Sequence, residues 1–198
     1  MPPSRRDELI ETAMDVFYRE GFNSTGIDRV LREAGISRMT LYNHFKSKDE
    51  LIVAALRRRD ELFRNRMARY IESKTKDPAE RLLAAFDFFA EWFASDNFNG
   101  CMFLNASSEF SDPDCAIRRT AAEHIRAVGE YVLGLCKAAN LRDPEFVARQ
   151  IHILLEGACA KAHALDQVDP SGEGYGRTIE AAKSAASAII ESARPQAA

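Results

Sequence analysis

The side chains between Gly35 and Lys48 are of the kinds that contact DNA. Arginine can pair with guanine, asparagine can pair with adenine, and methyl groups can contact thymine in the major groove. Hydroxyl, phenol and ammonium groups can bind the backbone phosphates and set the register. Residues 34–48 include basic side chains and no acidic one. The base-reading candidates are Arg38, Met39, Thr40, Asn43 and His44, and the phosphate-binding candidates are Ser37, Thr40, Tyr42 and Lys48.

Three helices must position these side chains. The hydrophobic pattern predicts helices over about Arg5–Glu20, Ile27–Ala34 and Arg38–His44. Gly35 supplies the backbone freedom for a tight turn between the second and third helices, as in a helix-turn-helix. Apolar packing between these two helices should turn the polar side of the third helix outward, with Phe45 in the core. The expected helix caps are Asn23, Ser24 or Thr25 for the second helix and Ser37 for the third.

The sequence around these helices resembles a known family. The segments Ala13–Phe22 and Thr25–Leu51, the latter with the specific motif YNHFKSK, closely resemble the N-terminal signature of the TetR (tetracycline-repressor-like) family. The segment Asn99–Glu109 is similar to the sixth helix of one subgroup of that family. The resemblance implies that Thr25 and Lys48 contact phosphate, that Tyr42 and His44 contact phosphate or pack against the DNA backbone, and that Arg38, Met39, Thr40 and Asn43 read the bases.

The whole chain reads as helical, so the predicted fold class is all-α with about nine helices. The N-terminal three-helix head is expected to occupy residues 1–50, and a helical ligand-binding and dimerisation domain is expected over residues 51–198. Asp77-Pro78, Asp112-Pro113 and Asp143-Pro144 are expected helix starts. Beyond the head, the expected helices cover about 48–73, 78–95, 102–110, 113–139, 144–165 and 175–192, with a loop at 166–174.

Charge and cysteine content restrict the class of protein. The formal net charge is −3, but residues 1–70 carry 14 basic against 11 acidic side chains. DNA binding requires only a local basic surface of this kind. The four cysteines form no CxxC pair, which predicts reduced thiols in the cytoplasm. No apolar run is long enough to span a membrane, and the N-terminus lacks a secretory pattern, so we expect a cytoplasmic protein without membrane contact.

The C-terminal part is expected to bind a small molecule. The family resemblance implies a ligand cavity between the fourth to eighth helices. Aromatic side chains cluster in the fifth helix, and an aromatic, mostly apolar lining suits an apolar effector. The ligand-binding candidates are Phe89, Trp92, Phe93, Cys101, Phe103, Asn105 and His124.

The eighth helix carries metal-ligating types along one face, namely His152, Glu156, Cys159 and His163. Helix positions seven apart are about 10 Å apart along the axis, so one ion cannot bind all four. The pattern therefore favours a polar wall of the ligand pocket or of the dimer interface, and we expect no metal and no cofactor.

The resemblance also implies a homodimer formed through the eighth and ninth helices, which would bind a palindromic operator in double-stranded DNA. The ninth helix carries a narrow stripe of mostly small residues that suits close helix approach. This candidate interface stripe consists of Ile179, Ala182, Ala186, Ile189 and Ile190. The eighth helix adds Ile151, Leu154, Leu155 and Ala158, some of which must serve the core of their own chain. The alternative is that the ninth helix only covers its own domain.

Three functions remain open from the sequence. The first is a repressor that a small hydrophobic effector releases from its operator. The second keeps the same DNA-binding head but senses oxidation through a thiol such as Cys101, although no basic residue stands beside Cys101 to lower its pKa. The third is a helical enzyme, which is disfavoured because no nucleophile–base pair or phosphate loop is visible. We therefore expect a DNA-binding regulator and not an enzyme.

Overall fold

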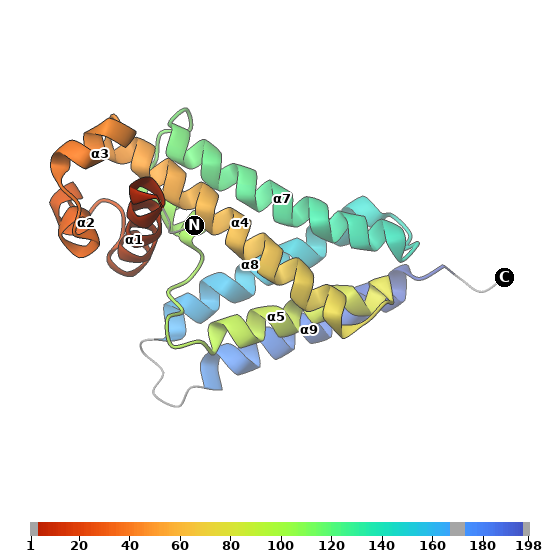
Figure 1. Cartoon of the computed structure of the whole chain (residues 1–198). Coiled ribbons are helices and arrows are strands. Elements are labelled where there is room, and N and C mark those ends of the chain that lie inside the picture. The colour runs from red at the N-terminus through yellow and green to blue at the C-terminus, as the bar shows by residue number, and fades with distance from the viewer. Residues whose placement is uncertain (1–3, 167–172, 196–198) are drawn as a thin grey trace. The chain divides into compact units, whose positions relative to one another are not determined.

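The computed structural model describes residues 4–166 and 173–195, and these residues form nine α-helices and no strand (Figure 1). The all-helical prediction is confirmed. The three head helices begin and end where the sequence predicted them. The helices are α1 (Arg5–Glu20), α2 (Ile27–Ala34), α3 (Arg38–His44), α4 (Lys48–Lys74), α5 (Pro78–Phe93), α6 (Met102–Glu109), α7 (Ala116–Ala138), α8 (Pro144–Asp166) and α9 (Glu173–Ala193).

The chain divides into two compact units, and the first contains the predicted head. Unit 1 covers the described residues up to Phe63 together with Met102–Ile125, and therefore adds α6 and the start of α7 to α1–α3 and the first half of α4. Its core is built from the apolar faces of these helices, including Leu9, Phe17 and Leu51. The predicted domain boundary at residue 50 stays a prediction.

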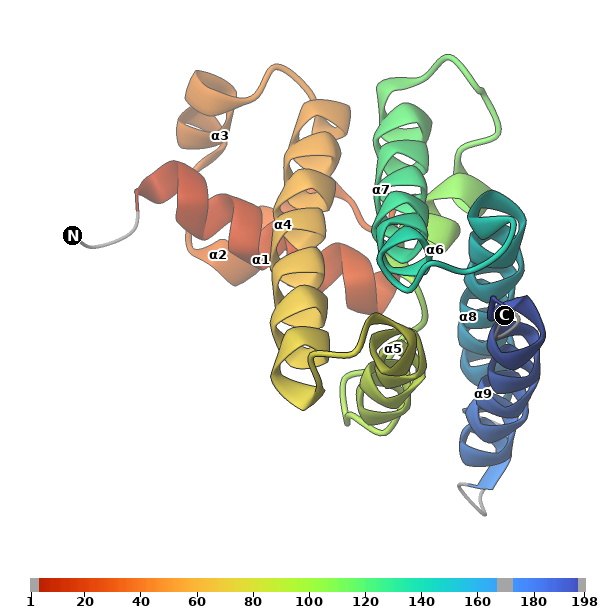
Figure 2. The same ribbon diagram turned by 90° about the vertical axis from the view of Figure 1, so that its right-hand side faces the viewer.

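Unit 2 covers Arg64–Cys101 and the described residues from Arg126 onward. Here α9 packs along α8, as Figures 1 and 2 both show, and it also contacts α5. The apolar stripe of α9 supplies this packing: Ile179, Ala182, Ala186 and Ile190 are buried within the chain. The prediction that these four residues face a partner was therefore wrong, because a side chain buried within its own unit cannot also form a dimer interface. Ile189 is half-buried, and its place in an interface stays a prediction.

Helix starts follow local capping. Asp77 caps α5 by accepting hydrogen bonds from the backbone N–H groups of Ala79 at 2.7 Å and Glu80 at 3.2 Å. The seventh helix begins three residues later than the Asp112-Pro113 signal predicted. There the Asp112 carboxylate accepts from the backbone N–H of Asp114, which makes a turn before α7 and delays the helix to Ala116.

Candidate nucleic-acid interface

Helix α3 presents the predicted DNA-contacting side chains to solvent. Leu41 is fully buried, whereas Met39 is 72% exposed and Tyr42 is 56% exposed. Large apolar or aromatic side chains left exposed on a short helix indicate a binding surface. Arg38, Asn43 and His44 are also exposed, and Thr40 is half-buried.

The turn before α3 fixes which face of this helix points outward. Gly35 has φ +63° and ψ +32°, the left-handed conformation that glycine adopts without strain. Ser37 caps α3 by accepting a hydrogen bond from the backbone N–H of Thr40 at 3.1 Å, as predicted. Ile36 and Phe45 are buried on either side of the helix, so both of its ends are anchored in the core.

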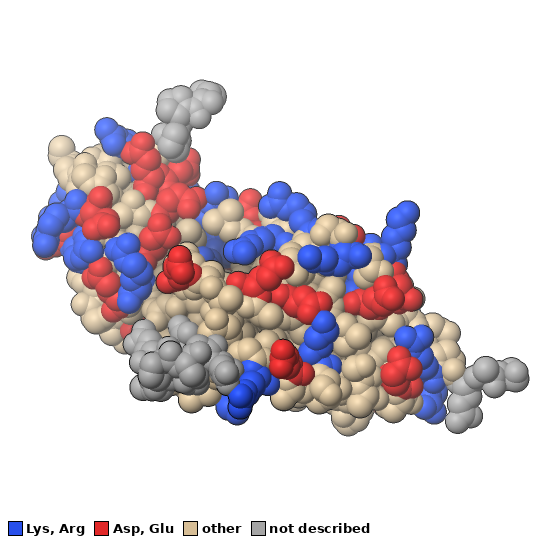
Figure 3. All heavy atoms as spheres, turned by 90° about the horizontal axis from the view of Figure 1, so that it is seen from below, with Lys and Arg blue, Asp and Glu red and all other residues tan. Residues whose placement is uncertain are grey.

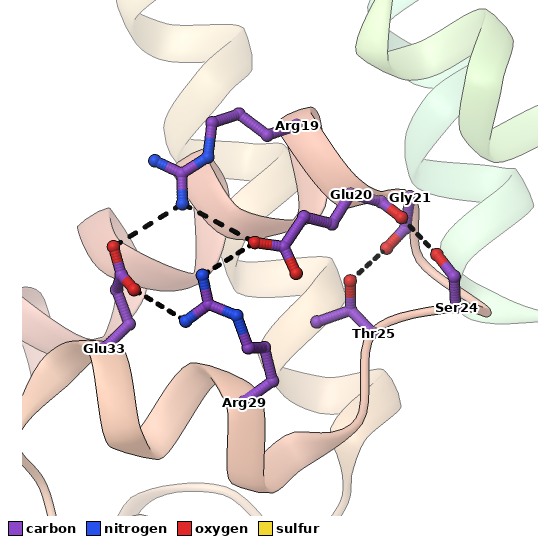
Figure 4. A network of polar contacts seen from close by, with 7 residues as sticks. All are labelled: Arg19, Glu20, Gly21, Ser24, Thr25, Arg29 and Glu33. Carbon is purple, nitrogen blue, oxygen red and sulfur yellow. Dashed lines mark hydrogen bonds and ion pairs between the residues drawn. The ribbon is translucent and has the colours of Figure 1, made fainter.

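The caps predicted for α2 were wrong. The N-cap is Gly26, and no side chain hydrogen bonds at that position. Thr25 is 1% exposed, and its hydroxyl donates to the carbonyl oxygen of Gly21 at 2.6 Å (Figure 4). Ser24 likewise donates to the carbonyl oxygen of Glu20. These hydroxyls close the turn after α1, since hydroxyl side chains compete for nearby backbone groups. The phosphate contact of Thr25 stays a prediction.

A network of ion pairs ties α1 to α2 (Figure 4). The Arg29 guanidinium lies 2.7 Å from the Glu20 carboxylate and 2.6 Å from that of Glu33. Arg19 joins the same two carboxylates at longer distances. The hydrogen bond from Arg29 holds the pKa of Glu33 below its usual value. Because all four side chains are at least partly exposed, this network orients α2 on α1 more than it stabilises the fold.

The predicted effector-binding residues divide between the two units. In unit 1, the rings of Phe103 and His124 stack with centroids 3.6 Å apart, and His124 Nδ1 lies 2.7 Å from Asp60 Oδ1. Both rings are buried. Asn105 is half-buried on the same helix as Phe103. The structure therefore brings α4, α6 and α7 together around His124, and its role in effector binding stays a prediction.

In unit 2, the α5 aromatics form one buried cluster. Trp92 makes edge-to-face contacts with Phe89, at a centroid distance of 5.6 Å, and with Phe98, at 5.2 Å. Phe93 packs against Phe89 and Phe98 as well. Phe98 belongs to this cluster and was not predicted, because it lies in the irregular segment after α5.

Cys101 lies beside Cys159 of α8, and its backbone N–H donates toward the Cys159 sulfur. Burial raises the pKa of the Cys159 thiol. A thiol with a raised pKa is a poor nucleophile, which weighs against a redox centre at this pair.

The chain matches two family models. Residues 9–55 match the model described as bacterial regulatory proteins, tetR family, and residues 78–175 match the tetracyclin repressor-like C-terminal domain. The crystal structure of SCO4454, a TetR-family transcriptional regulator from Streptomyces coelicolor, superposes on 96% of both chains with a TM-score of 0.84 and 28% sequence identity. The chain belongs to the TetR family of transcriptional regulators.

Two relatives of this TetR-family chain match over shorter stretches. The transcriptional activator FasR of Mycolicibacterium smegmatis is 33% identical over 112 residues, which are 57% of this chain and 50% of FasR. The transcriptional repressor KstR2 of the same organism is 34% identical over 85 residues, which are 43% of this chain and 41% of KstR2. The family resemblance predicted from the N-terminal motif is thereby confirmed.

A contact that the sequence did not predict links α6 to the DNA-binding head of this TetR-family chain. The Glu109 carboxylate accepts hydrogen bonds from the backbone N–H groups of Phe22 at 3.1 Å and Asn23 at 2.6 Å. Lys48 Nζ donates to the Phe22 carbonyl oxygen at 2.6 Å, so Phe22 is held from both sides. A carboxylate at a helix C-terminus opposes the helix dipole, and this unfavourable placement was the only sequence signal of a partner.

Unit 1 also contains an open groove of about 930 Å³ between α1 and α4. Charged side chains of both signs line it, including Arg6, Asp7, Asp49, Arg57 and Glu61. An ion pair between Arg58 Nε and Glu11 Oε1, 2.6 Å apart, joins the two helices there. None of the predicted effector-binding residues lines this groove.

The ligand types along α8 do not gather into a metal site. His152 Nε2 lies 3.5 Å from Glu156 Oε1, while the His163 ring contacts Phe98. Among residues 4–166 and 173–195, no group of three His, Cys, Asp or Glu side chains could hold a metal ion. None of the helices within this part of the chain is long and apolar enough to cross a membrane.

Proposed function

We propose that this protein is a homodimeric repressor that binds a palindromic operator through α3 and leaves it when a small apolar effector binds. The observation that best supports this proposal is the outer face of α3, where Leu41 is buried and anchors the helix. The exposed side chains on this face are Arg38, Met39, Tyr42 and Asn43. In a helix-turn-helix, the second helix of the motif, here α3, lies in the major groove and reads base edges. The protein has no catalytic role in this proposal, and it acts in the cytoplasm on DNA.

The dimer would form through the outer faces of α8 and α9. Ile153 of α8 is 61% exposed, although isoleucine is usually buried. Exposed small residues follow it at helical spacing, and a second row of exposed small residues runs along α9. Such faces allow two helices to approach closely. The proposed interface consists of Ile153, Gly157, Ala160 and Ala164 of α8 and Ala181, Ala185 and Ala188 of α9.

The charge distribution is compatible with a local DNA contact. Basic and acidic side chains intermingle on the face seen in Figure 3, so no broad basic surface spreads over it. A head that depends on a few contacts from α3 gains affinity when two copies are joined. Half-sites would then be spaced by about one helical turn, about 34–36 Å, or a multiple of it.

Effector release requires only that the effector bind one conformer more tightly than the DNA-bound one. The aromatic cluster around Trp92 supports an apolar effector. Repression is the proposed direction of regulation because KstR2 and also NemR of Escherichia coli are named repressors, whereas FasR is named an activator.

The decisive experiment selects binding sites from a randomised DNA duplex library with the purified full chain. We expect enrichment of a palindrome, with affinity that falls as salt rises because phosphate contacts release counterions. A matched selection with Arg38→Ala should enrich a different or shorter site. A wild-type chain that enriches no sequence would remove the DNA-binding proposal.

A further inference from the structure

Arg38, the strongest base-reading candidate, is engaged by an acid from the preceding helix. Its Nε donates to Asp28 Oδ1 at 2.7 Å, and its Nη2 donates to Asp28 Oδ2. The two side chains are 62% and 58% exposed, so the pair lies on the surface of the head. Asp28 is in the first turn of α2, and Arg38 is the first residue of α3.

An acid at this place is unexpected on a DNA-binding surface. Phosphates repel carboxylates, and residues 34–48 contain no acid at all. The hydrogen bond from Arg38 holds the pKa of Asp28 below its usual value, so Asp28 is ionised at neutral pH. The Asp28 carboxylate therefore places a negative charge beside α3, although a negative charge there repels the DNA phosphates and weakens binding.

The geometry of the guanidinium suggests what this acid does. Arginine has five N–H donors in a planar fork. Asp28 occupies the edge formed by Nε and Nη2. The opposite end of the fork, with Nη1 and the second N–H of Nη2, has no hydrogen-bond partner within residues 4–166 and 173–195. That end carries two parallel donors, which is the arrangement that pairs with O6 and N7 of guanine.

We propose that Asp28 is a specificity-determining positioning residue that holds the Arg38 guanidinium with its free end toward one guanine of the operator. The inference rests on the proposed function, since it assumes that α3 reads bases. Asp28 acts only through Arg38. A long side chain that is already oriented loses less rotamer freedom when it binds DNA. A guanidinium fixed in this way also cannot reorient to form hydrogen bonds with a different base, which favours guanine.

A different outcome follows if Asp28 merely competes with DNA for Arg38. In that case, removing the carboxylate frees Arg38 and raises affinity for every sequence. If Asp28 positions Arg38, removing it lowers the preference for guanine at one base pair. The two roles therefore change the binding of correct and substituted operators in different ways.

The test uses the duplex that the wild-type chain enriches from a randomised library. Four versions of this duplex differ only at the base pair where Arg38→Ala loses the guanine preference of the wild-type chain. Each version carries a different base at that position. We expect Arg38→Ala to lower that preference by about tenfold or more, and Asp28→Ala to lower it by about three- to tenfold. Asp28→Asn should lie between Asp28→Ala and the wild type, because the amide can accept only one of the two hydrogen bonds. The double variant should match Arg38→Ala, since Asp28 has no effect without its partner.

Asp49→Asn is the matched control. Asp49 is also an exposed acid in the first turn of a helix, α4, in the same unit, but no contact joins it to Arg38. This variant should change the affinity for all four duplexes alike and leave the guanine preference intact. All variants change exposed side chains, and their melting curves would verify that each is folded.

The inference is overturned if Asp28→Ala retains the wild-type guanine preference, or if it binds all four duplexes more tightly with unchanged ratios. Either result leaves the proposed function in place. Failure of the proposed function is distinct, because the wild-type chain would then enrich no sequence from the library.

Discussion

Removing the Glu109 carboxylate should lower both the stability of unit 1 and the affinity of the protein for its operator. Hydrogen bonds to a charged acceptor contribute about 1.5–3 kcal/mol each. Glu109→Ala removes two of them, but the exposed N–H of Asn23 can bind water instead. The partly buried N–H of Phe22 cannot do so as readily. Losing an acid from the C-terminus of α6 returns about 0.3–1 kcal/mol through the helix dipole.

The net expected loss is therefore about 2 kcal/mol, a decrease of roughly 4–8 °C in the melting temperature for a chain of this size. Operator affinity should fall as well, because Phe22 immediately precedes the turn that leads into α2. Thermal unfolding and operator titration of the same preparation measure both effects. Glu109→Gln should show an intermediate loss, since its amide keeps one acceptor oxygen and places an N–H₂ group against the second backbone donor.

Glu145→Ala is the matched control, because Glu145 is an exposed carboxylate of unit 2 that pairs with Lys137. Because Glu145 is exposed and lies in the first turn of α8, its removal should lower stability less than Glu109→Ala does and leave operator affinity unchanged. If Glu109→Ala melted and bound like this control, the contact between α6 and the head would contribute nothing, and the reasoning from its hydrogen bonds would be refuted.

Three further predictions concern the dimer, the effector and the thiols. Ile153→Glu should yield a folded monomer in sedimentation, because it places a charge in the proposed interface. Ala186→Glu should instead lower the melting temperature, because Ala186 is fully buried within its own chain. A stable Ile153→Glu dimer would mean that the interface lies elsewhere. An apolar effector should shift the emission of Trp92, the single tryptophan, in parallel with operator release, and release without any change in emission would place the effector away from the α5 cluster. Burial raises the pKa of Cys136 to about 11, so only about one Cys136 thiol in a thousand is ionised at pH 8. Its reaction with a disulfide reagent should therefore be slow and should become about tenfold faster per pH unit, and half-buried Cys115 should react first. Equal rates for the two cysteines would contradict the burial of Cys136.

The parts of the fold that were predictable are those set by neighbours in sequence. Ser37 caps α3 and Gly35 adopts the left-handed conformation because both signals act within four residues. The exposed face of α3 also followed from the sequence, since Leu41 and Phe45 are the apolar positions that anchor it. The caps of α2 failed as predictions because Ser24 and Thr25 have two backbone alternatives, and their hydroxyls turn back to α1.

The sequence by itself determined the helices, the helix-turn-helix and the family, because periodicity, glycine conformation and short motifs are local properties of the chain. Only the tertiary structure decided which apolar faces are already covered. The stripe of α9 looked like an interface, but it packs against α5 and α8, and the exposed face is the one that carries Ile153 on α8. Tertiary structure also brought Glu109 to Phe22, which are far apart along the chain. No periodicity encodes such a contact, because it depends on how separate helices pack in space.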